Sequence, residues 1–179
     1  MAAQTLLTIA TRGPGLYEFT REATAFVAGA GIETGLLTLF VRHTSCSLLI
    51  QENADPDVRV DLDAFFRRLV PSADDPAMDY LVHRAEGPDD MPAHIKAALT
   101  PVSLSIPVMG GRLALGTWQG IYLFEHRARP HRGAAPRGVR HPHPARSAFS
   151  ASIRFDASAL LRSSAKSPGR CVCSDRVLR

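Results

Sequence analysis

The stretch "LLTLFVRHTSCSLLIQENADP", residues 36–56, decides which fold class the sequence favours. Residues 36–42 and 46–51 are short apolar runs, and three polar residues separate them. Runs of this length between polar residues are typical of buried strands. Asp55 and Pro56 then predict the start of a helix, because aspartate caps a helix well and proline fits its first turn. The stretch therefore indicates a β-rich fold with short helices.

The sequence on both sides extends this pattern. Further strands are predicted over 5–10, 15–20, 102–108, 112–116 and 117–127, and helices over 21–31 and 92–100. A further helix, between these two, is predicted to start at Pro56 and to be ended by Pro71. Thr20 is expected to cap the first helix and Gly31 to end it. The second helix carries a stripe predicted to be buried, formed by Val58, Leu62, Phe65 or Phe66, and Leu69. We expect an α+β fold that is mainly β, an antiparallel β-sandwich with a few short helices.

The charge distribution divides the chain into a domain, residues 1–131, and a tail, residues 132–179. Residues 1–130 contain 11 basic and 15 acidic residues, whereas residues 131–179 contain 10 basic and 2 acidic residues. The net charge of +4 therefore comes from the tail. This Arg/Pro/Ser-rich segment has too few apolar residues to offset its ordering entropy, so we expect most of it to be disordered. Nucleic acid is an unlikely partner, because only the tail is basic.

The composition also limits where the protein works. No apolar run reaches the length of a membrane span, so no membrane partner is expected. The first residues lack a signal-peptide pattern, and three cysteines do not make a disulfide framework. A cytoplasmic location is the prediction.

Four histidines of the domain lie beside other polar residues of catalytic type. They are His43, His83, His94 and His126. Asp90 precedes His94 by four residues, so both project from one face of the predicted helix. The histidines could share a pocket that binds a metal or transfers protons, or they could be four separate surface residues.

Three other features have two interpretations each. In "EGPDDMPAH", residues 86–94, Asp89 and Asp90 could form a phosphate or metal–phosphate site, or simply cap a helix. Trp118, in "GTWQG", could line an aromatic ligand or lie in the core. Cys46 could be a nucleophile beside His43, although a small buried residue is the better interpretation.

Four blocks together resemble the YjbQ-like family over about residues 4–130. In order they are "HTSCSLLIQENADP", "DLDAFFRRLVP", "HRAEGPDDMPAHIK" and "GGRLALGTWQGIYLFEHR". The resemblance implies a jelly-roll-like sandwich that assembles as a homotrimer, with a polar pocket near the subunit contacts. It also implies a secondary thiamine-phosphate synthase activity, which joins a hydroxymethylpyrimidine diphosphate to a thiazole phosphate and releases diphosphate.

The resemblance also implies the residues of the site. Catalytic roles fall to His43, His83, Glu86 and His94. A divalent metal, Mg²⁺ or Zn²⁺, would be bound by residues from the set His43, His83, Glu86, Asp90, His94 and His126. The phosphorylated substrate would contact Ser45, Glu52, Asn53, Lys96, Trp118, Gln119 and Arg127, and Glu125 lies in the same blocks. A metal-dependent phosphoester hydrolase and a non-catalytic binder of a phosphorylated metabolite are the alternatives.

The tail departs from the family pattern. Family members continue after the "EHR" segment with a basic turn and one last strand. Here the turn is present, but we expect the strand to be absent, which suggests a frameshift after His131. Loss of the strand would leave a sheet edge open and favour aggregation.

Overall fold

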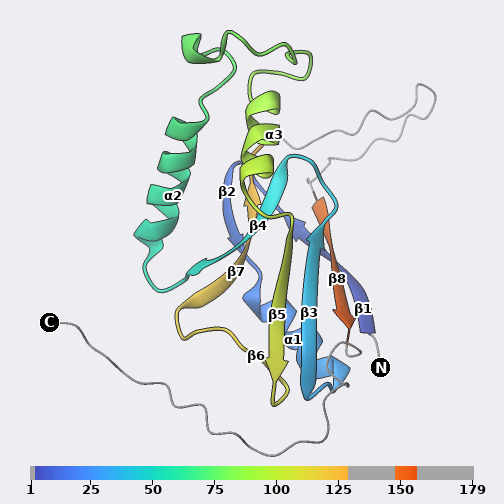
Figure 1. Ribbon diagram of the computed structural model, residues 1–179. Coiled ribbons are helices and arrows are strands. Elements are labelled where there is room, and N and C mark those ends of the chain that lie inside the picture. The colour runs from blue at the N-terminus through green and yellow to red at the C-terminus, as the bar shows by residue number, and fades with distance from the viewer. Residues whose placement is uncertain (1–2, 129–147, 157–179) are drawn as a thin grey trace, which may run out of the picture.

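The computed structural model describes residues 3–128 and 148–156, which form two antiparallel sheets and a few helices (Figure 1). The five-stranded sheet contains, in spatial order, β1 (Ala3–Ala10), β8 (Ala148–Asp156), β3 (Thr34–Val41), β5 (Ser103–Met109) and β6 (Arg112–Leu113). The three-stranded sheet contains β2 (Gly15–Glu18), β7 (Gln119–Glu125) and β4 (Cys46–Glu52), in that order. The predicted α+β class with mainly antiparallel strands is confirmed.

The helices are α1 (Thr20–Ala30), α2 (Pro56–Leu69), the short 3₁₀ helix η1 (Pro76–Met78) and α3 (Asp90–Leu99). Gly31 ends α1 in the left-handed conformation, with φ of 63°, as predicted. Gly110 and Gly111, with φ of 57° and 73°, make the predicted turn between β5 and β6. Within the described residues no helix is long and apolar enough to cross a membrane.

One core joins the two sheets. Its buried residues come from α1 and from strands of both sheets, and they include Val27, Leu37, Leu39, Leu48, Ile106, Ile121 and Leu123. Burial alternates along β3, where Leu37, Leu39 and Val41 are buried and Leu36, Thr38 and Phe40 are not. This alternation is what a strand with one face on the core requires.

The segment between β3 and β4 passes from one sheet to the other. β3 pairs with β5 and β8, whereas β4 pairs with β7. The backbone N–H groups of Val41 and Leu48 donate to the carbonyls of Val102 and Pro101, which hold this crossing against the start of β5. Residues 42–45, with His43, therefore lie where the two sheets meet.

Helix α2 begins as predicted but packs less than predicted. The Asp55 carboxylate accepts a hydrogen bond from the Asp57 N–H at 2.9 Å, and Pro56 follows it. No residue of α2 is fully buried, and Leu69 is more than half exposed, so the buried stripe is wrong for Leu69. Of the two alternatives Phe65 and Phe66, Phe65 is the exposed one. Phe66 packs edge-on against Phe124 at 5.1 Å between ring centroids. In Figure 1 the helix lies at the outer side of the molecule beside β2, so only one of its faces meets the sheet.

Thr20 is not the N-cap of α1, contrary to the prediction. The cap residue is Phe19, which provides no side-chain bond. The Thr20 hydroxyl instead donates to Glu18 at 2.8 Å and accepts from the Ile121 N–H at 2.9 Å. The Thr20 hydroxyl, which the local sequence assigned to a helix cap, therefore bonds to the distant strand β7 instead.

The missing last strand is present in the structure, so that prediction is wrong. Strand β8 lies between β1 and β3 and pairs with both in antiparallel register. It takes its residues from within the predicted tail. The disorder expected for the rest of the tail falls outside the described residues.

Candidate functional site

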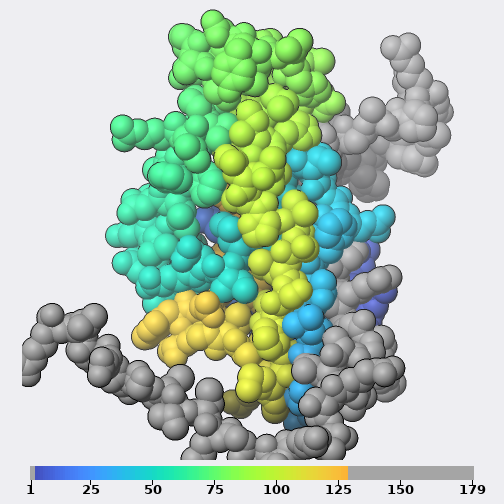
Figure 2. All heavy atoms as spheres, viewed as in Figure 1, coloured from blue at the N-terminus to red at the C-terminus, as the bar shows by residue number. Residues whose placement is uncertain are grey.

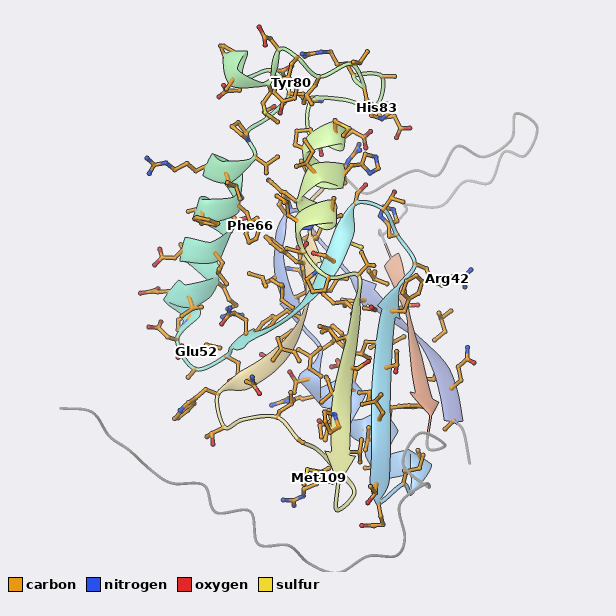
Figure 3. All side chains as sticks on the ribbon, in the orientation of Figure 1. Arg42, Glu52, Phe66, Tyr80, His83 and Met109 are labelled. Carbon is orange, nitrogen blue, oxygen red and sulfur yellow. The ribbon has the colours of Figure 1, made fainter. Side chains whose placement is uncertain are left out.

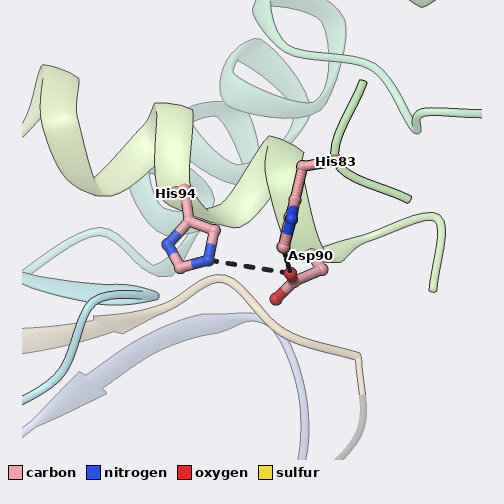
Figure 4. A group of neighbouring side chains, drawn as sticks. All are labelled: His83, Asp90 and His94. Atoms are coloured by element: carbon pink, nitrogen blue, oxygen red, sulfur yellow. Dashed lines mark hydrogen bonds and ion pairs between the residues drawn. The ribbon is translucent and has the colours of Figure 1, made fainter. Parts of the chain in front are cut away.

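Three metal-ligand-type side chains converge where α3 begins. One nitrogen or oxygen from each of His83, Asp90 and His94 lies within 4.8 Å of the others (Figure 4). His83 Nε2 lies 2.6 Å from Asp90 Oδ2, and His94 Nε2 lies 3.6 Å from the same oxygen. We call these residues the His–Asp cluster. The predicted i, i+4 placement of Asp90 and His94 on one helix face is what brings two of them together.

The loop before α3 holds His83 at the cluster. Arg84 donates hydrogen bonds to the carbonyls of Ala73, Met78 and Leu81 at 2.8, 3.1 and 2.9 Å. Met78, in the same segment, is buried. Fixing the backbone at Arg84 also fixes its neighbour, so His83 is presented from an anchored loop although its own side chain is half exposed.

Asp90 is almost completely buried, and Arg127 neutralises it. Arg127 Nη1 pairs with Asp90 Oδ1, and Arg127 Nη2 donates to the Glu86 carbonyl at 3.1 Å. The two side chains are 6% and 1% exposed, so their charges need one another. Because Oδ1 faces the arginine, Oδ2 is the oxygen that faces both histidines.

The tautomer of His94 follows from its second contact. His94 Nδ1 lies 3.0 Å from the Thr44 carbonyl, which can only accept a hydrogen bond. Nδ1 must therefore carry a proton, and in the neutral ring Nε2 presents a lone pair. That lone pair faces Asp90 Oδ2, another acceptor. Such an arrangement is favourable when a proton or a metal ion lies between the two atoms.

Asp89 makes no side-chain cap bond at the start of α3. Its Oδ2 accepts from the Ala128 N–H at 2.7 Å and lies 3.3 Å from Arg127 Nε. Asp89 and Asp90 therefore both join α3 to the end of β7. Side-chain capping, the simpler interpretation, does not describe either acid.

An open hollow of about 500 Å³ adjoins the His–Asp cluster. It is lined by Phe40, Arg42, His43, Thr44, His94, Ala97 and Val102, among others. His43 Nδ1 accepts a hydrogen bond from the Ser45 N–H at 3.0 Å, which orients the ring. His43 thus lies beside the cluster without belonging to it, and Glu86 reaches Arg127 through its backbone carbonyl.

The predicted metal ligand His126 lies apart from the cluster. Its Nε2 is 3.0 Å from the hydroxyl of Ser47, and the ring packs against Phe124. Burial lowers the pKa of His126 to about 3, and the charge of Lys96 adds to the effect. His126 is therefore neutral near pH 7.

Glu125 and Cys46 face each other across β7 and β4 and are both buried. Burial raises the pKa of Glu125, although hydrogen bonds from the Arg127 N–H and the Thr11 hydroxyl oppose the shift. Burial and then the Glu125 charge raise the pKa of the Cys46 thiol to about 12. Cys46 is thus a packing residue, as predicted, because the thiolate is the nucleophilic form.

Four predicted substrate residues lie at the other end of the strands. Glu52 pairs with Gln119, whereas Cys46 at the start of the same strand pairs with Glu125. Seven strand residues place these ends about 20 Å apart. Figure 3 shows Glu52 far from His83. Asn53 donates to Glu18 at 3.3 Å, and Trp118 is 63% exposed. Within one chain these residues do not meet the His–Asp cluster.

Three residues that shape the candidate site were not identified from the sequence. Arg42, at the strand end, lines the hollow, and its position next to His43 was a usable signal. The Thr44 carbonyl and the Arg84 guanidinium act through backbone contacts. Residue type alone does not reveal such contacts.

Comparison with known proteins gives consistent matches. The family model described as "UPF0047 protein YjbQ-like" matches residues 5–137. A UPF0047 protein of Synechocystis is 56% identical over 128 residues, which cover 72% of this chain and 84% of that protein. A UPF0047 protein YjbQ of Salmonella typhimurium is 47% identical over 125 residues, covering 69% and 87%.

Solved structures match over a larger share of their chains. A conserved hypothetical protein of Thermus thermophilus aligns with TM-score 0.64 and 31% identity, covering 84% of this chain and 98% of that one. An uncharacterised protein of the same family from Clostridium acetobutylicum gives TM-score 0.67 and 26% identity, covering 85% and 99%. The structural match extends beyond residue 137, and β8 is the described element there.

Proposed function

The chain belongs to the UPF0047 (YjbQ-like) family, and on that premise we propose that the His–Asp cluster binds a divalent metal ion and serves a reaction of a phosphorylated small molecule. The reaction that we favour is the joining of hydroxymethylpyrimidine diphosphate to thiazole phosphate with release of diphosphate. The curated relatives name no activity in their descriptions, so the reaction rests on the resemblance and the metal site on geometry.

One observation gives the main support for a metal ion at the His–Asp cluster. His94 Nε2 and Asp90 Oδ2, both lone-pair donors, face each other at 3.6 Å, and Thr44 fixes the tautomer that makes this so. His83 reaches the same oxygen from an anchored loop. Two imidazoles and one carboxylate with partly exposed histidines form a donor set that leaves room for further ligands. The residues therefore fit a catalytic rather than a closed structural metal site.

Each side chain around the cluster would have its own role in such a reaction. Arg127 pairs with Asp90 and orients it, and the Thr44 carbonyl orients His94. The adjoining hollow receives the substrate, with Arg42 available to a phosphate group and Phe40 and Val102 to its apolar part. A divalent cation in the cluster would neutralise charge on phosphate oxygens or lower the pKa of a bound water.

A metal-dependent phosphoester hydrolase is the second candidate, and the donor set gives it specific support. Magnesium prefers an octahedron of oxygen ligands, whereas zinc binds imidazole nitrogens readily. Two of the three side chains in the cluster are histidines. Zinc is thus the better fit, and a zinc-bound water suits hydrolysis as well as group transfer.

Assembly belongs to the same proposal. Phe65 and Leu69 on the outer side of α2 are 57% and 52% exposed, and Val60 on that helix is 63% exposed. Exposed apolar residues on one helix support contact with another copy of the chain. These residues support the predicted homotrimer. The jelly-roll-like sandwich and the cytoplasmic location stay predictions of the resemblance and of the sequence. A homotrimer could also bring Trp118 of one copy toward the cluster of another.

Metal content and activity test the proposal together. Elemental analysis of wild type is expected to show about one zinc or other divalent ion per chain, lost in His83→Ala and His94→Ala. His43→Ala is the matched control, because His43 lines the hollow outside the cluster. It should keep the metal and lose activity. Metal that stays in His94→Ala refutes the site.

Product analysis separates the candidates. Wild type is incubated with the two thiamine precursors, and separately with phosphomonoesters, with Mg²⁺ or Zn²⁺ added. Thiamine phosphate formation that needs His94 supports the transferase. Release of inorganic phosphate without joining supports the hydrolase, and bound metal with neither product supports a binding protein.

A further inference from the structure

A second hollow lies on another side of α3. It has a volume of about 300 Å³ and lies between the end of α2, α3 and the end of β7. Three prolines, a valine and an alanine line it together with Arg67, Ser72, Asp89, Lys96 and His126. We call it the α2–α3 hollow. Figure 2 shows the recess between these two helices, with atoms of the N-terminal part of the chain at its base.

The α2–α3 hollow is separate from the His–Asp cluster. Lys96 follows His94 by two residues on α3, so at 3.6 residues per turn the two side chains project about 160° apart. Pro92 and Lys96 line the α2–α3 hollow, whereas His94 lines the hollow beside the cluster. The helix body therefore divides the two spaces.

The charge of the α2–α3 hollow is not balanced. The carboxylates that act on Lys96 belong to Asp63 and Asp89. Asp63 already pairs with Arg67 at 2.7 Å, and Asp89 already pairs with Arg127 at 3.3 Å. No ion pair of Lys96 itself occurs among the described residues. One half-buried ammonium group thus faces a largely apolar space without a neutralising partner.

The wall also contains an unsatisfied hydrogen-bonding atom. His126 is 4% exposed and uses Nε2 for the Ser47 hydroxyl. Its Nδ1 is buried and has no hydrogen-bond partner among the described residues. Buried polar atoms of this kind usually have a partner, so a ligand or a water is expected beside the ring. The hydroxyl of Ser72 is a further polar group of the same wall.

We propose that the α2–α3 hollow is a binding site for a small organic anion, a carboxylate or phosphate monoester on a compact apolar body. The Lys96 ammonium pairs with the anionic group, and the proline-lined wall contacts the apolar body. The volume lies at the lower end of the usual range for small-molecule sites, roughly 300–1,000 Å³, so the ligand is small. The proline walls favour binding, because proline has little conformational freedom to lose.

The lysine content makes a direct test possible. Lys96 and Lys166 are the two lysines of the sequence, so selective ¹⁵N labelling of lysine gives two side-chain signals at most. The full chain is titrated with phenyl phosphate, benzoate and neutral benzyl alcohol. The two anions are expected to shift the Lys96 signal saturably, and benzyl alcohol is not. A response to benzoate alone or to phenyl phosphate alone assigns the anion type.

Variants exclude binding elsewhere. Calorimetric affinity for the better anion should fall about tenfold or more in Lys96→Met and recover in part in Lys96→Arg. Arg112→Met, an exposed cation on β6, is the matched control and should bind as wild type does. His94→Ala should also bind normally, so failure of the metal site leaves this test intact.

Three results overturn the proposal. They are no saturable shift with either anion, equal binding of benzyl alcohol, and unchanged affinity in Lys96→Met. Circular dichroism of each variant reports whether it folds. If Lys96→Met does not fold, the wild-type lysine signal with the two anions and with benzyl alcohol still decides the matter.

Discussion

Replacing Arg127 by methionine is expected to destabilise the protein strongly, because the change leaves a buried carboxylate without its partner. Arg127 and Asp90 are 6% and 1% exposed and form an ion pair. Removing one member of a buried pair costs about 3–5 kcal/mol. Methionine keeps much of the side-chain volume, so the effect reports the lost charge rather than a cavity.

The magnitude can be measured by urea unfolding followed by circular dichroism. With an m-value of about 2 kcal/mol per M, a loss of 4 kcal/mol lowers the midpoint by about 2 M. Arg67→Met is the matched control, because Arg67 pairs with Asp63 at 2.7 Å on the surface, where the arginine is 63% exposed. That change should cost about 0.3–0.5 kcal/mol.

A double-mutant cycle then isolates the pair. Asp90→Asn removes the charge that Arg127 neutralises, so Arg127→Met should cost much less in that background. The reasoning is refuted if Arg127→Met costs no more than Arg67→Met, or if the two changes at the buried pair are additive.

Four further predictions concern other parts of the fold. His126→Gln should make the free energy of unfolding less dependent on pH. Neutral His126 contributes stability above its unfolded pKa of about 6.5, and this contribution is lost as the pH falls from 6.5 toward about 3. The urea midpoint of wild type should therefore drop more steeply over that pH range than the midpoint of the variant. Leu39→Ala in the core should cost about 2–5 kcal/mol in the same unfolding assay, and Leu6→Ala, at a position 55% exposed, much less. Removing residues from 148 onward should leave β1 without its sheet partner and cause aggregation in size-exclusion chromatography, whereas a monodisperse folded product contradicts the role of β8. In a variant with Cys171 and Cys173 replaced by serine, the Cys46 thiol should react with a maleimide only when the chain unfolds, so rapid labelling in native buffer contradicts its burial.

The elements with local causes could be predicted from the sequence. Asp55 with Pro56, and Gly110 with Gly111, act within a few residues, so their cap and turn are present as expected. The i, i+4 spacing of Asp90 and His94 is likewise local and led to two members of the cluster. His83 joined them through a loop whose path depends on Arg84, and no spacing rule describes that path.

The parts that could not be read from the sequence depend on contacts between distant residues. The assignment of Glu52 and His43 to one site stays a prediction, because β4 holds its two ends apart within one chain and only a contact between copies could bring them together. Leu69 fits a buried helical stripe, yet periodicity cannot show whether another surface covers it. Strand β8 had a readable signal: apolar residues alternate at 149, 151, 153 and 155, which the Arg-rich composition of the whole tail concealed.

The position of β8 sets an order for folding during synthesis. Among the described residues β1 is the first strand and β8 is the last. In the described structure β1 pairs with β8 alone. Until the ribosome has made residue 156, β1 and one edge of β3 have exposed backbone groups that can pair with other chains. Pairing of such distant segments also closes a very long loop, which slows folding. The nascent chain is thus expected to be most vulnerable to aggregation in the interval between synthesis of β7 and synthesis of β8.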